Sequence, residues 1–237
     1  MKNKNTIKQE LSKAYFGKES KNYDYKRSKN KKSRYILERK TNIIKKFLKI
    51  EKGQNILDVA CGTGRFFYLY GSRKIYGIDL SKDQLAEARK KDKKAILKIC
   101  DAEKICYPDN KFDVVITSQF IEHIPQYNQV IKEMVRVCKK GGVLIIDFPN
   151  KHSLTYLPTK IRLLLGKLRW LNLFSKKDIQ KIAKDFNLEI IGWDYTVIIT
   201  PHIFPDFLTP LIKRIDWLLY KFFKRFGYLH YVKFRKK

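Results

Sequence analysis

The sequence contains no apolar run that approaches the ~18 residues of a membrane-spanning helix. Residues 1–18 carry many charges and lack the apolar centre of a secretory signal. Cysteine is also scarce and shows no C-x-x-C spacing, so a zinc site is not indicated. We therefore expect a cytoplasmic protein with reduced thiols in or near its core. The cysteines are Cys61, Cys100, Cys106 and Cys138.

Acidic residues are few, with 23 Asp and Glu against 52 Lys and Arg, and the formal net charge is +29. Such an excess favours contact with anions such as nucleic acid or acidic lipid headgroups. A lysine- and isoleucine-rich proteome would produce the same bias, so the charge alone identifies no partner. The length of 237 residues suits one α/β domain with appendages.

A short apolar stretch followed by glycines is the most informative feature of the chain. Residues 56–59 are typical of a buried strand, and Gly62 and Gly64 turn the chain into a helix expected to begin near Arg65. Glycines at such a turn let backbone N–H groups approach a ligand, because no Cβ intervenes. The dinucleotide fingerprint G-x-G-x-x-G is not met, since Phe67 occupies the third glycine position.

Asp58 stands just before this turn. Its carboxylate would repel a pyrophosphate and attract a ligand with ammonium and sulfonium groups, which points to S-adenosylmethionine. Here the sequence resembles the class I S-adenosylmethionine-dependent methyltransferases, whose first motif is D-x-G-x-G-x-G, with Ala60 at the first glycine. The resemblance covers roughly residues 35–200. It implies a doubly wound, Rossmann-like α/β fold with a mostly parallel, seven-stranded sheet and helical appendages at both ends.

Strand and helix patterns alternate through this region, which predicts a parallel sheet with helices on both faces. The last strands would form an antiparallel hairpin, as in the family that the sequence resembles. Strands are expected at 74–79, 95–100, 112–117, 143–148 and within 188–200. Helices are expected at 34–48, 82–91, 125–138 and 175–185, with Ser81 and Ser175 as N-caps.

Ligands of such a sheet bind beyond the carboxyl ends of the strands. Asp79 ends the second strand at the family's ribose-binding position, where a carboxylate accepts from both ribose hydroxyls; otherwise it only precedes a helix cap. Asp101 and Ala102 match the positions at which the family binds adenine, and Leu80 would pack against the adenine face. The residues expected to bind the cofactor are Asp58, Ala60, Gly62, Gly64, Asp79, Leu80, Asp101, Ala102 and Ser118.

The segment 117–124 resembles the loop after the fourth strand in the branch that contains the ubiquinone-type O-methyltransferases, where a Glu-His pair is common. Methyl transfer depends mainly on positioning, but a hydroxyl acceptor also benefits from a base. His123 is the candidate for this catalytic role, unless it only caps a helix or lines the cofactor pocket. Residues 118–120 do not resemble the Asn/Asp-Pro-Pro-aromatic run of amine methylases, so nucleic acid is a less favoured substrate.

Three further segments surround the expected methyltransferase domain, residues 51–200. In the methyltransferases that the sequence resembles, the segment before the first motif often folds over the cofactor. The resemblance thus implies that residues 1–50 form a basic helical extension over the cofactor site. Tyr23 or Tyr25 would then lie above the cofactor; otherwise they are ordinary surface tyrosines. Residues 150–174 are a basic, leucine-rich insertion. In the enzymes that the sequence resembles, such insertions cover the acceptor pocket, so the same role is expected here. Residues 201–237 would form a basic amphipathic tail.

In this tail, residues 208–226 have apolar side chains at helical spacing. Such a helix lies in a membrane interface or packs on its own domain or a second subunit. The first alternative would make the protein peripheral on the inner face of the membrane, in contact with anionic lipid through 207–237.

The resemblance and the residues together predict a methyltransferase that acts on a small, hydrophobic or lipid-linked acceptor, with O-methylation favoured. One alternative is an RNA methyltransferase that binds phosphates through its basic N-terminal arm. Another is a protein that binds S-adenosylmethionine without turnover. The sequence leaves the oligomeric state open.

Overall fold

A seven-stranded sheet with the order β3-β2-β1-β4-β5-β7-β6 forms the centre of the protein. This computed structural model describes residues 22, 24–25, 27–48, 53–71, 74–153, 161, 164–165, 171–199 and 204–237. The strands are β1 (Asn55–Val59), β2 (Lys74–Asp79), β3 (Ile96–Ile99), β4 (Phe112–Thr117), β5 (Cys138–Pro149), β6 (Leu188–Tyr195) and β7 (Leu229–Lys236). The first five strands pair in parallel, and β7 runs antiparallel between β5 and β6. The predicted mostly parallel, seven-stranded sheet is confirmed.

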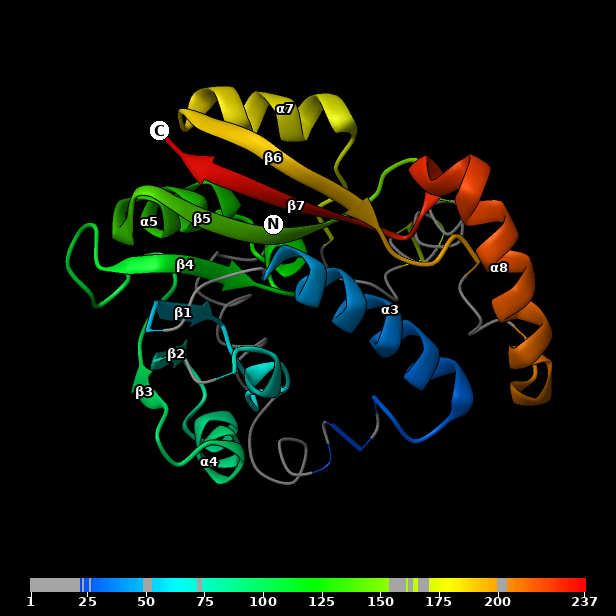
Figure 1. The fold of residues 1–237 in the computed structure, drawn as a ribbon, viewed down its shortest axis with the longest axis horizontal. Helices are drawn as coiled ribbons and strands as arrows, with labels where there is room; N and C mark the ends of the chain where they lie inside the picture. The colour runs from blue at the N-terminus through cyan, green and yellow to red at the C-terminus, as the bar shows by residue number, and fades with distance from the viewer. Residues whose placement is uncertain are drawn as a thin grey trace.

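Helices cover both faces of this sheet. They are α3 (Lys31–Phe47), α4 (Lys82–Lys91), α5 (Tyr127–Val137), α7 (Lys176–Asp185) and α8 (Thr209–Phe223). Figure 1 shows α8 at the right-hand edge of the molecule, beside α3. Of the helices in the described part of the chain, none is both long enough and apolar enough to cross a membrane.

Apolar side chains pack on both faces because successive residues of a strand point to opposite sides. On one face, Met134 of α5 and Ile179 of α7 join a core with Val115 of β4. On the other face, α3 and α4 contribute Ile44 and Leu85 to a second core. The predicted caps are confirmed, since the Ser81 hydroxyl accepts from Gln84 N–H and Ser175 forms a capping box.

The assignment of 201–237 to a tail outside the sheet is wrong. Its last part is β7, which pairs with both β5 and β6 and carries the buried residues Tyr231 and Phe234. The expected hairpin within 188–200 is therefore absent from the described residues, and β6 finds its partner only after α8. Basic residues such as Lys233 and Arg235 concealed the strand. Helix α8 thus belongs to the connection between the edge strand β6 and its neighbour β7, and its predicted helical conformation is confirmed.

The helix expected from Arg65 is also wrong. After the glycine turn, the chain forms only a single 3₁₀ turn, Phe67–Leu69. Phe66, Phe67, Leu69 and Tyr70 are all buried. Four buried residues among five consecutive positions exceed one face of an α-helix, and a tight turn packs them instead. Of the cysteines, Cys106 is exposed, whereas the other three are buried, and all four are free thiols.

Candidate active site

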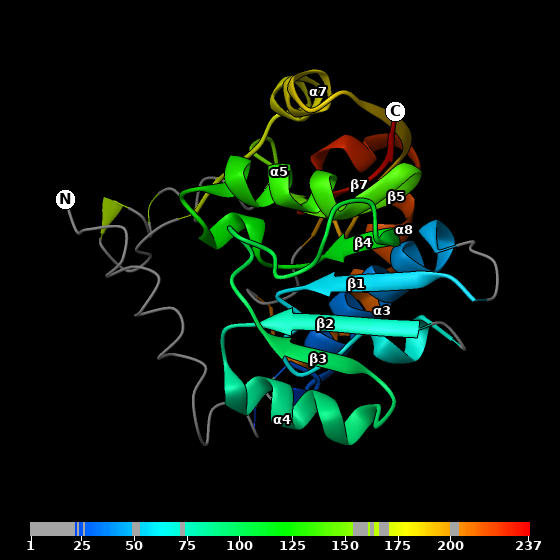
Figure 2. The same cartoon turned by 90° about the vertical axis from the view of Figure 1, so that its left-hand side faces the viewer.

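A cavity opens at the carboxyl ends of β1 to β4, where four loops meet. Figure 2 shows β1, β2 and β4 side by side, with their arrowheads at the same edge of the sheet. This cavity is lined by every cofactor-binding and catalytic residue that the sequence predicted, with the exception of Gly64. The ones that line it are Asp58, Ala60, Gly62, Asp79, Leu80, Asp101, Ala102, Ser118 and His123.

The turn after β1 has the left-handed backbone that its glycines permit. Gly62 and Gly64 have φ values of 54° and 65°, and Ala60 has a φ of 56° in the same region. An alanine tolerates this conformation at a cost of about 1–2 kcal/mol. Gly64 instead packs inward, because a Cβ there would lie 2.6 Å from the ring of Phe67. Glycine is therefore required at position 64 for packing, and this inward packing explains why Gly64 does not line the cavity.

Asp58 is a buried carboxyl group whose hydrogen bond comes from a neutral group. The Tyr70 hydroxyl donates to Asp58 Oδ2 at 2.6 Å. Burial raises the pKa of Asp58 to about 7, the Tyr70 hydrogen bond opposes this rise, and the charge of Asp79 adds to it. Asp58 therefore changes its charge near neutral pH in the free protein.

Asp79 connects the loop after β1 to the loop after β2. Its Oδ2 accepts from Gly62 N–H at 2.9 Å, and its Oδ1 accepts from Ser81 N–H at 2.9 Å. Burial raises the pKa of this carboxyl, while the backbone donors oppose the rise. Leu80, next to it, is 41% exposed and lines the cavity.

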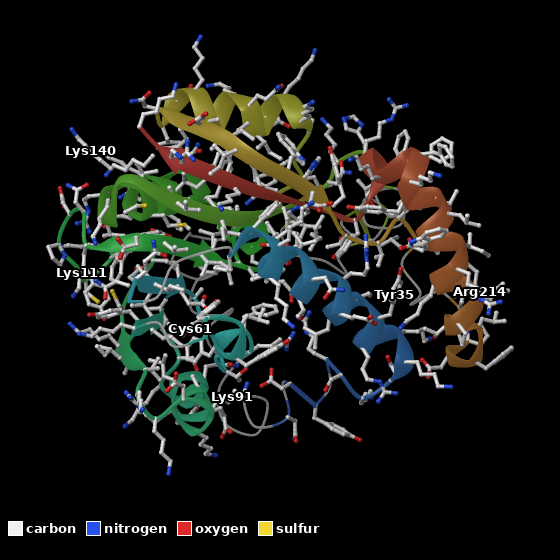
Figure 3. All side chains as sticks on the ribbon, in the orientation of Figure 1. Tyr35, Cys61, Lys91, Lys111, Lys140 and Arg214 are labelled. Carbon is white, nitrogen blue, oxygen red and sulfur yellow. The ribbon has the colours of Figure 1, made fainter. Side chains whose placement is uncertain are left out.

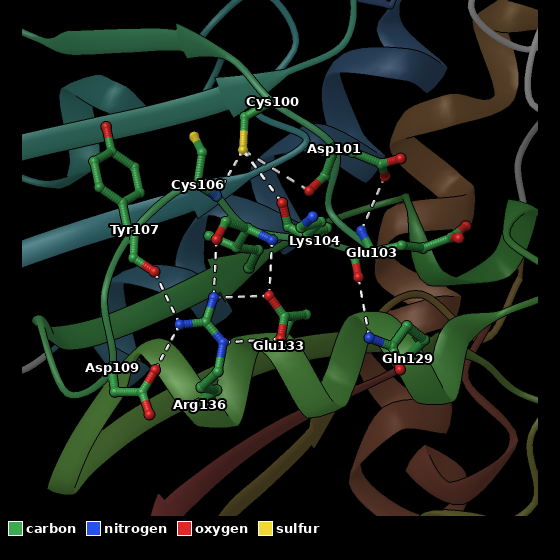
Figure 4. A network of polar contacts seen from close by, with 11 residues as sticks. Cys100, Asp101, Glu103, Lys104, Cys106, Tyr107, Asp109, Gln129, Glu133 and Arg136 are labelled. Atoms are coloured by element: carbon green, nitrogen blue, oxygen red, sulfur yellow. Dashed lines mark hydrogen bonds and ion pairs between the residues drawn. The ribbon is translucent and has the colours of Figure 1, made fainter.

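The loop after β3 is held by a network of polar contacts around α5 (Figure 4). Arg136 donates to the carbonyls of Tyr107 at 2.9 Å and Ile105 at 2.8 Å. It also pairs with Glu133, which accepts from Ile105 N–H at 2.8 Å. The hydrogen bond from Arg136 holds the pKa of Glu133 below its usual value. This network fixes the loop that begins with Asp101. Within the loop, Asp101 Oδ1 accepts a hydrogen bond from Glu103 N–H at 2.9 Å.

The end of β4 is joined to β5 through Asp147. Ser118 donates its hydroxyl to Asp147 Oδ2 at 3.0 Å, and Gln119 N–H donates to Oδ1 at 2.8 Å. The Tyr231 hydroxyl on β7 lies 3.1 Å from Ser118 Oγ. Burial raises the pKa of Asp147 to about 6, and the charge of Glu122 adds to this rise. The Ser118 hydroxyl is thus engaged by the protein itself.

His123 lines the cavity beside a buried acid. Its Nε2 lies 3.2 Å from Glu122 Oε1, and its side chain is 33% exposed. Burial raises the pKa of Glu122, but the hydrogen bond with His123 and the charge of Lys40 outweigh it, so this pKa stays below its usual value. Lys40 is itself buried on α3, and burial lowers its pKa to about 8.

Several residues of the site were missed by the sequence analysis. One of them is Lys40, which is buried on α3. The cavity is also lined by Arg65, Phe66, Gln84, Gln119, Phe120 and Ile124. Phe66 and Phe120 each lie two positions after an expected site residue, Gly64 and Ser118, which could have suggested them.

Asp24 places part of the N-terminal segment against the glycine turn. It accepts from Thr63 Oγ1 at 2.9 Å and from Arg65 Nε at 3.0 Å, and it also pairs with Lys91. Tyr25 is 67% exposed and is not among the residues that line the cavity. Tyr23 and most of the expected acceptor lid, 150–174, lie outside the described residues.

Residues 57–146 match a family described as a methyltransferase domain. A phosphatidylethanolamine N-methyltransferase from Cereibacter sphaeroides is 31% identical over 150 residues, which cover 59% of this chain and 72% of that protein. A demethylmenaquinone methyltransferase from Listeria welshimeri is 35% identical over 109 residues, 42% of this chain and 46% of that protein. The chain therefore matches less than half the length of the latter relative.

Solved structures share the fold. Magnesium protoporphyrin IX methyltransferase from Synechocystis PCC 6803, with bound SAH, superposes with a TM-score of 0.69 at 17% identity, over 98% of this chain and all of that one. The [4+2]-cyclase SpnF superposes with a TM-score of 0.62 at 22% identity, over 84% of this chain and 80% of that one. A cyclase on the same fold illustrates that the fold alone does not define the reaction.

The sheet order and the cavity at its carboxyl edge are those of a Rossmann-like methyltransferase. The chain belongs to the S-adenosylmethionine-dependent methyltransferases, and S-adenosylmethionine is its cofactor.

Proposed function

We propose that this protein transfers a methyl group to a small, apolar or lipid-linked acceptor, with O-methylation favoured. The observation that carries this proposal is the composition of the cavity. Four acidic side chains line it, and the apolar residues Phe120 and Ile124 line it on either side of His123 in the chain. The acidic residues are Asp58, Asp79, Asp101 and Glu103. The carboxylates suit a polar, cationic cofactor, and the apolar side chains suit a hydrophobic acceptor.

The cavity residues fit S-adenosylmethionine. The buried Asp58 has a neutral phenol as its hydrogen-bond partner, and a bound ammonium group would stabilise its charged form. We assign the ribose hydroxyls to Asp79, and the adenine to Asp101, Ala102 and Leu80. Ala60 and Gly62 line the cavity with left-handed backbone, and the lack of a Cβ at Gly62 permits close approach of a ligand. When bound, the cofactor supplies an electrophilic methyl group.

His123 is the proposed base. Its Nε2 faces Glu122 at 3.2 Å, which leaves Nδ1 as the nitrogen that would accept the proton of an acceptor hydroxyl. Glu122 is buried and acidic, so it would orient the ring and stabilise the imidazolium that forms. Ser118, held by Asp147, would shape the same end of the cavity.

The names of the relatives support an apolar acceptor, since they refer to phosphatidylethanolamine and demethylmenaquinone. Acceptors of that kind reside in membranes. We therefore infer that the protein acts as a peripheral protein at a lipid surface.

Labelled methyl transfer into an extract of the source cell tests this proposal. The extract is incubated with the protein and S-adenosylmethionine labelled in its methyl group, then partitioned into organic solvent and treated with RNase. Label in the organic layer is the expected result. RNase-sensitive label in the aqueous layer would refute the proposal and indicate an RNA methyltransferase. Absence of label in both layers would favour a protein that binds S-adenosylmethionine without turnover.

A further inference from the structure

Helix α8 has an unusual distribution of polar and apolar residues. Its most buried positions include Asp216, which is 0% exposed, and Thr209. Its outward face is apolar, with side chains that are 54% to 74% exposed. These outward residues, together with one from the preceding turn, are Phe207, Leu211, Leu218 and Phe222. A helix on the surface of a soluble protein has the reverse arrangement.

The buried aspartate fixes this orientation. Asp216 Oδ2 accepts from the Tyr35 hydroxyl at 2.5 Å, and Oδ1 accepts from Ile198 N–H at 2.7 Å and from Ile199 N–H at 2.9 Å. Turning the apolar face inward would leave these buried donors without their acceptor, which is unfavourable. The outward apolar face is therefore built into the packing of α8.

Basic and aromatic residues flank the apolar face on one side. Arg214 and Lys221 are seven residues apart, which places them two turns apart on nearly the same side of the helix. Trp217, between them in the chain, is 69% exposed. Figure 3 shows Tyr35 between α3 and α8, and Arg214 on the side of α8 away from α3.

This combination fits an anionic lipid surface. Apolar side chains enter the acyl region, tryptophan lies at the headgroup level, and cations contact phosphates. A second copy of this chain would bring the same net charge of +29 to the contact, so self-association is electrostatically disfavoured. An exposed apolar stripe of this kind marks an interaction surface.

We propose that the outward face of α8, defined by Phe207, Leu211, Leu218 and Phe222 with Arg214, Trp217 and Lys221 at its flank, docks onto a bilayer with anionic headgroups. Docking itself stands on the geometry of α8. Its meaning for catalysis, access to a lipid-linked acceptor, rests on the proposed function.

Flotation of the full chain with vesicles tests the docking. Vesicles of phosphatidylcholine alone are compared with vesicles that also contain phosphatidylglycerol. The double variant Arg214→Gln/Lys221→Gln should bind the anionic vesicles roughly thirtyfold more weakly. The triple variant Leu211→Gln/Leu218→Gln/Phe222→Gln should lose at least about tenfold on both kinds of vesicle. The charge-matched control Lys177→Gln/Lys184→Gln, on exposed positions of α7, should bind like the wild type.

Thermal unfolding and S-adenosylmethionine affinity, measured on each variant, should be unchanged, which separates docking from folding and from the cofactor site. Wild-type protein that does not float, or α8 variants that float as well as the wild type, would overturn the proposal. A wild-type dimer that the triple variant converts to a monomer would also overturn it, because the face would then belong to a second copy. Flotation that persists without methyl transfer would leave the docking intact and refute only the proposed function.

Discussion

The hydroxyl of Tyr70 donates a 2.6 Å hydrogen bond to Oδ2 of Asp58, the buried carboxyl at the end of β1. A neutral donor stabilises a carboxylate less than a cation does. Burial therefore prevails, and the pKa of Asp58 is about 7. The relationship makes the charge at this end of the cavity dependent on pH within the physiological range, with consequences for both binding and stability.

Cofactor affinity should fall as the pH is lowered through 7. The proposed contact with the ammonium group requires the Asp58 carboxylate, and protonation removes that charge. Below its pKa, the affinity for S-adenosylmethionine should approach a tenfold loss for each pH unit. Calorimetric titration from about pH 8.5 to about pH 5.5 measures this. An Asp58→Asn variant should bind weakly at every pH, and an identical pH dependence in that variant would refute the assignment.

The same carboxyl should lower the stability of the free protein at high pH. The pKa of Asp58 rises from 3.8 to about 7 on folding, so the folded state binds this proton more tightly than the unfolded chain. Its contribution to stability is fully present below pH 3.8 and is lost as the pH rises through 7. Asp58→Asn keeps the site neutral and should raise the free energy of unfolding at pH 8 by on the order of 4 kcal/mol. Denaturant unfolding at pH 8 and at about pH 4 should show that this gain disappears in acid; a gain of equal size at both pH values would contradict the account.

Gly64 should be required for packing, and the matched control is Gly53. Both have positive φ values, 65° and 86°, so alanine is strained at either position. A Cβ at Gly64 would also lie 2.6 Å from the Phe67 ring, whereas one at Gly53 meets nothing within 4 Å. Gly53→Ala should cost about 1 kcal/mol of folding free energy and Gly64→Ala at least about 2 kcal/mol. Chemical denaturation of both variants measures the difference, and equal costs would show that the ring moves aside freely.

His123→Ala should lower turnover with little change in cofactor affinity. The imidazole lines the cavity and is proposed to take a proton from the acceptor, a role worth about 10²–10⁴-fold in rate. Methyl transfer into the organic extract gives the rate, and calorimetry gives the affinity. Lys184→Ala, at an exposed position of α7 outside the cavity lining and outside the insertion 150–174, is the control. Wild-type turnover in His123→Ala would remove this residue from the mechanism.

The centre of the parallel half of the sheet was predictable because its strands are buried on both faces and appear in the sequence as short apolar runs. β1 and β4 are examples. The acids Asp79 and Asp101 could then be placed, since the ends of parallel strands share one edge.

Long-range contacts could not be predicted in this way. β7 mixes buried residues with lysine and arginine and follows a helix, so its place between β5 and β6 depends on pairing with residues far away in the chain. Lys40 has no local signal for its interaction with Glu122 and Asp147, which arises only when α3 packs on the sheet. The inward position of Asp216 likewise depends on the backbone of 198–199.

The central claim is that the cavity at the carboxyl edge binds S-adenosylmethionine through the acids that end its strands. Calorimetric titration of the cofactor into wild-type protein, Asp79→Ala and Asp83→Ala tests it most directly, since Asp83 is an exposed acid in the first turn of α4. Loss of charge-assisted hydrogen bonds at Asp79 should cost about 1.5–3 kcal/mol, roughly tenfold to more than a hundredfold in affinity. Asp83→Ala should bind like the wild type. Undiminished binding by a folded Asp79→Ala variant would contradict the account.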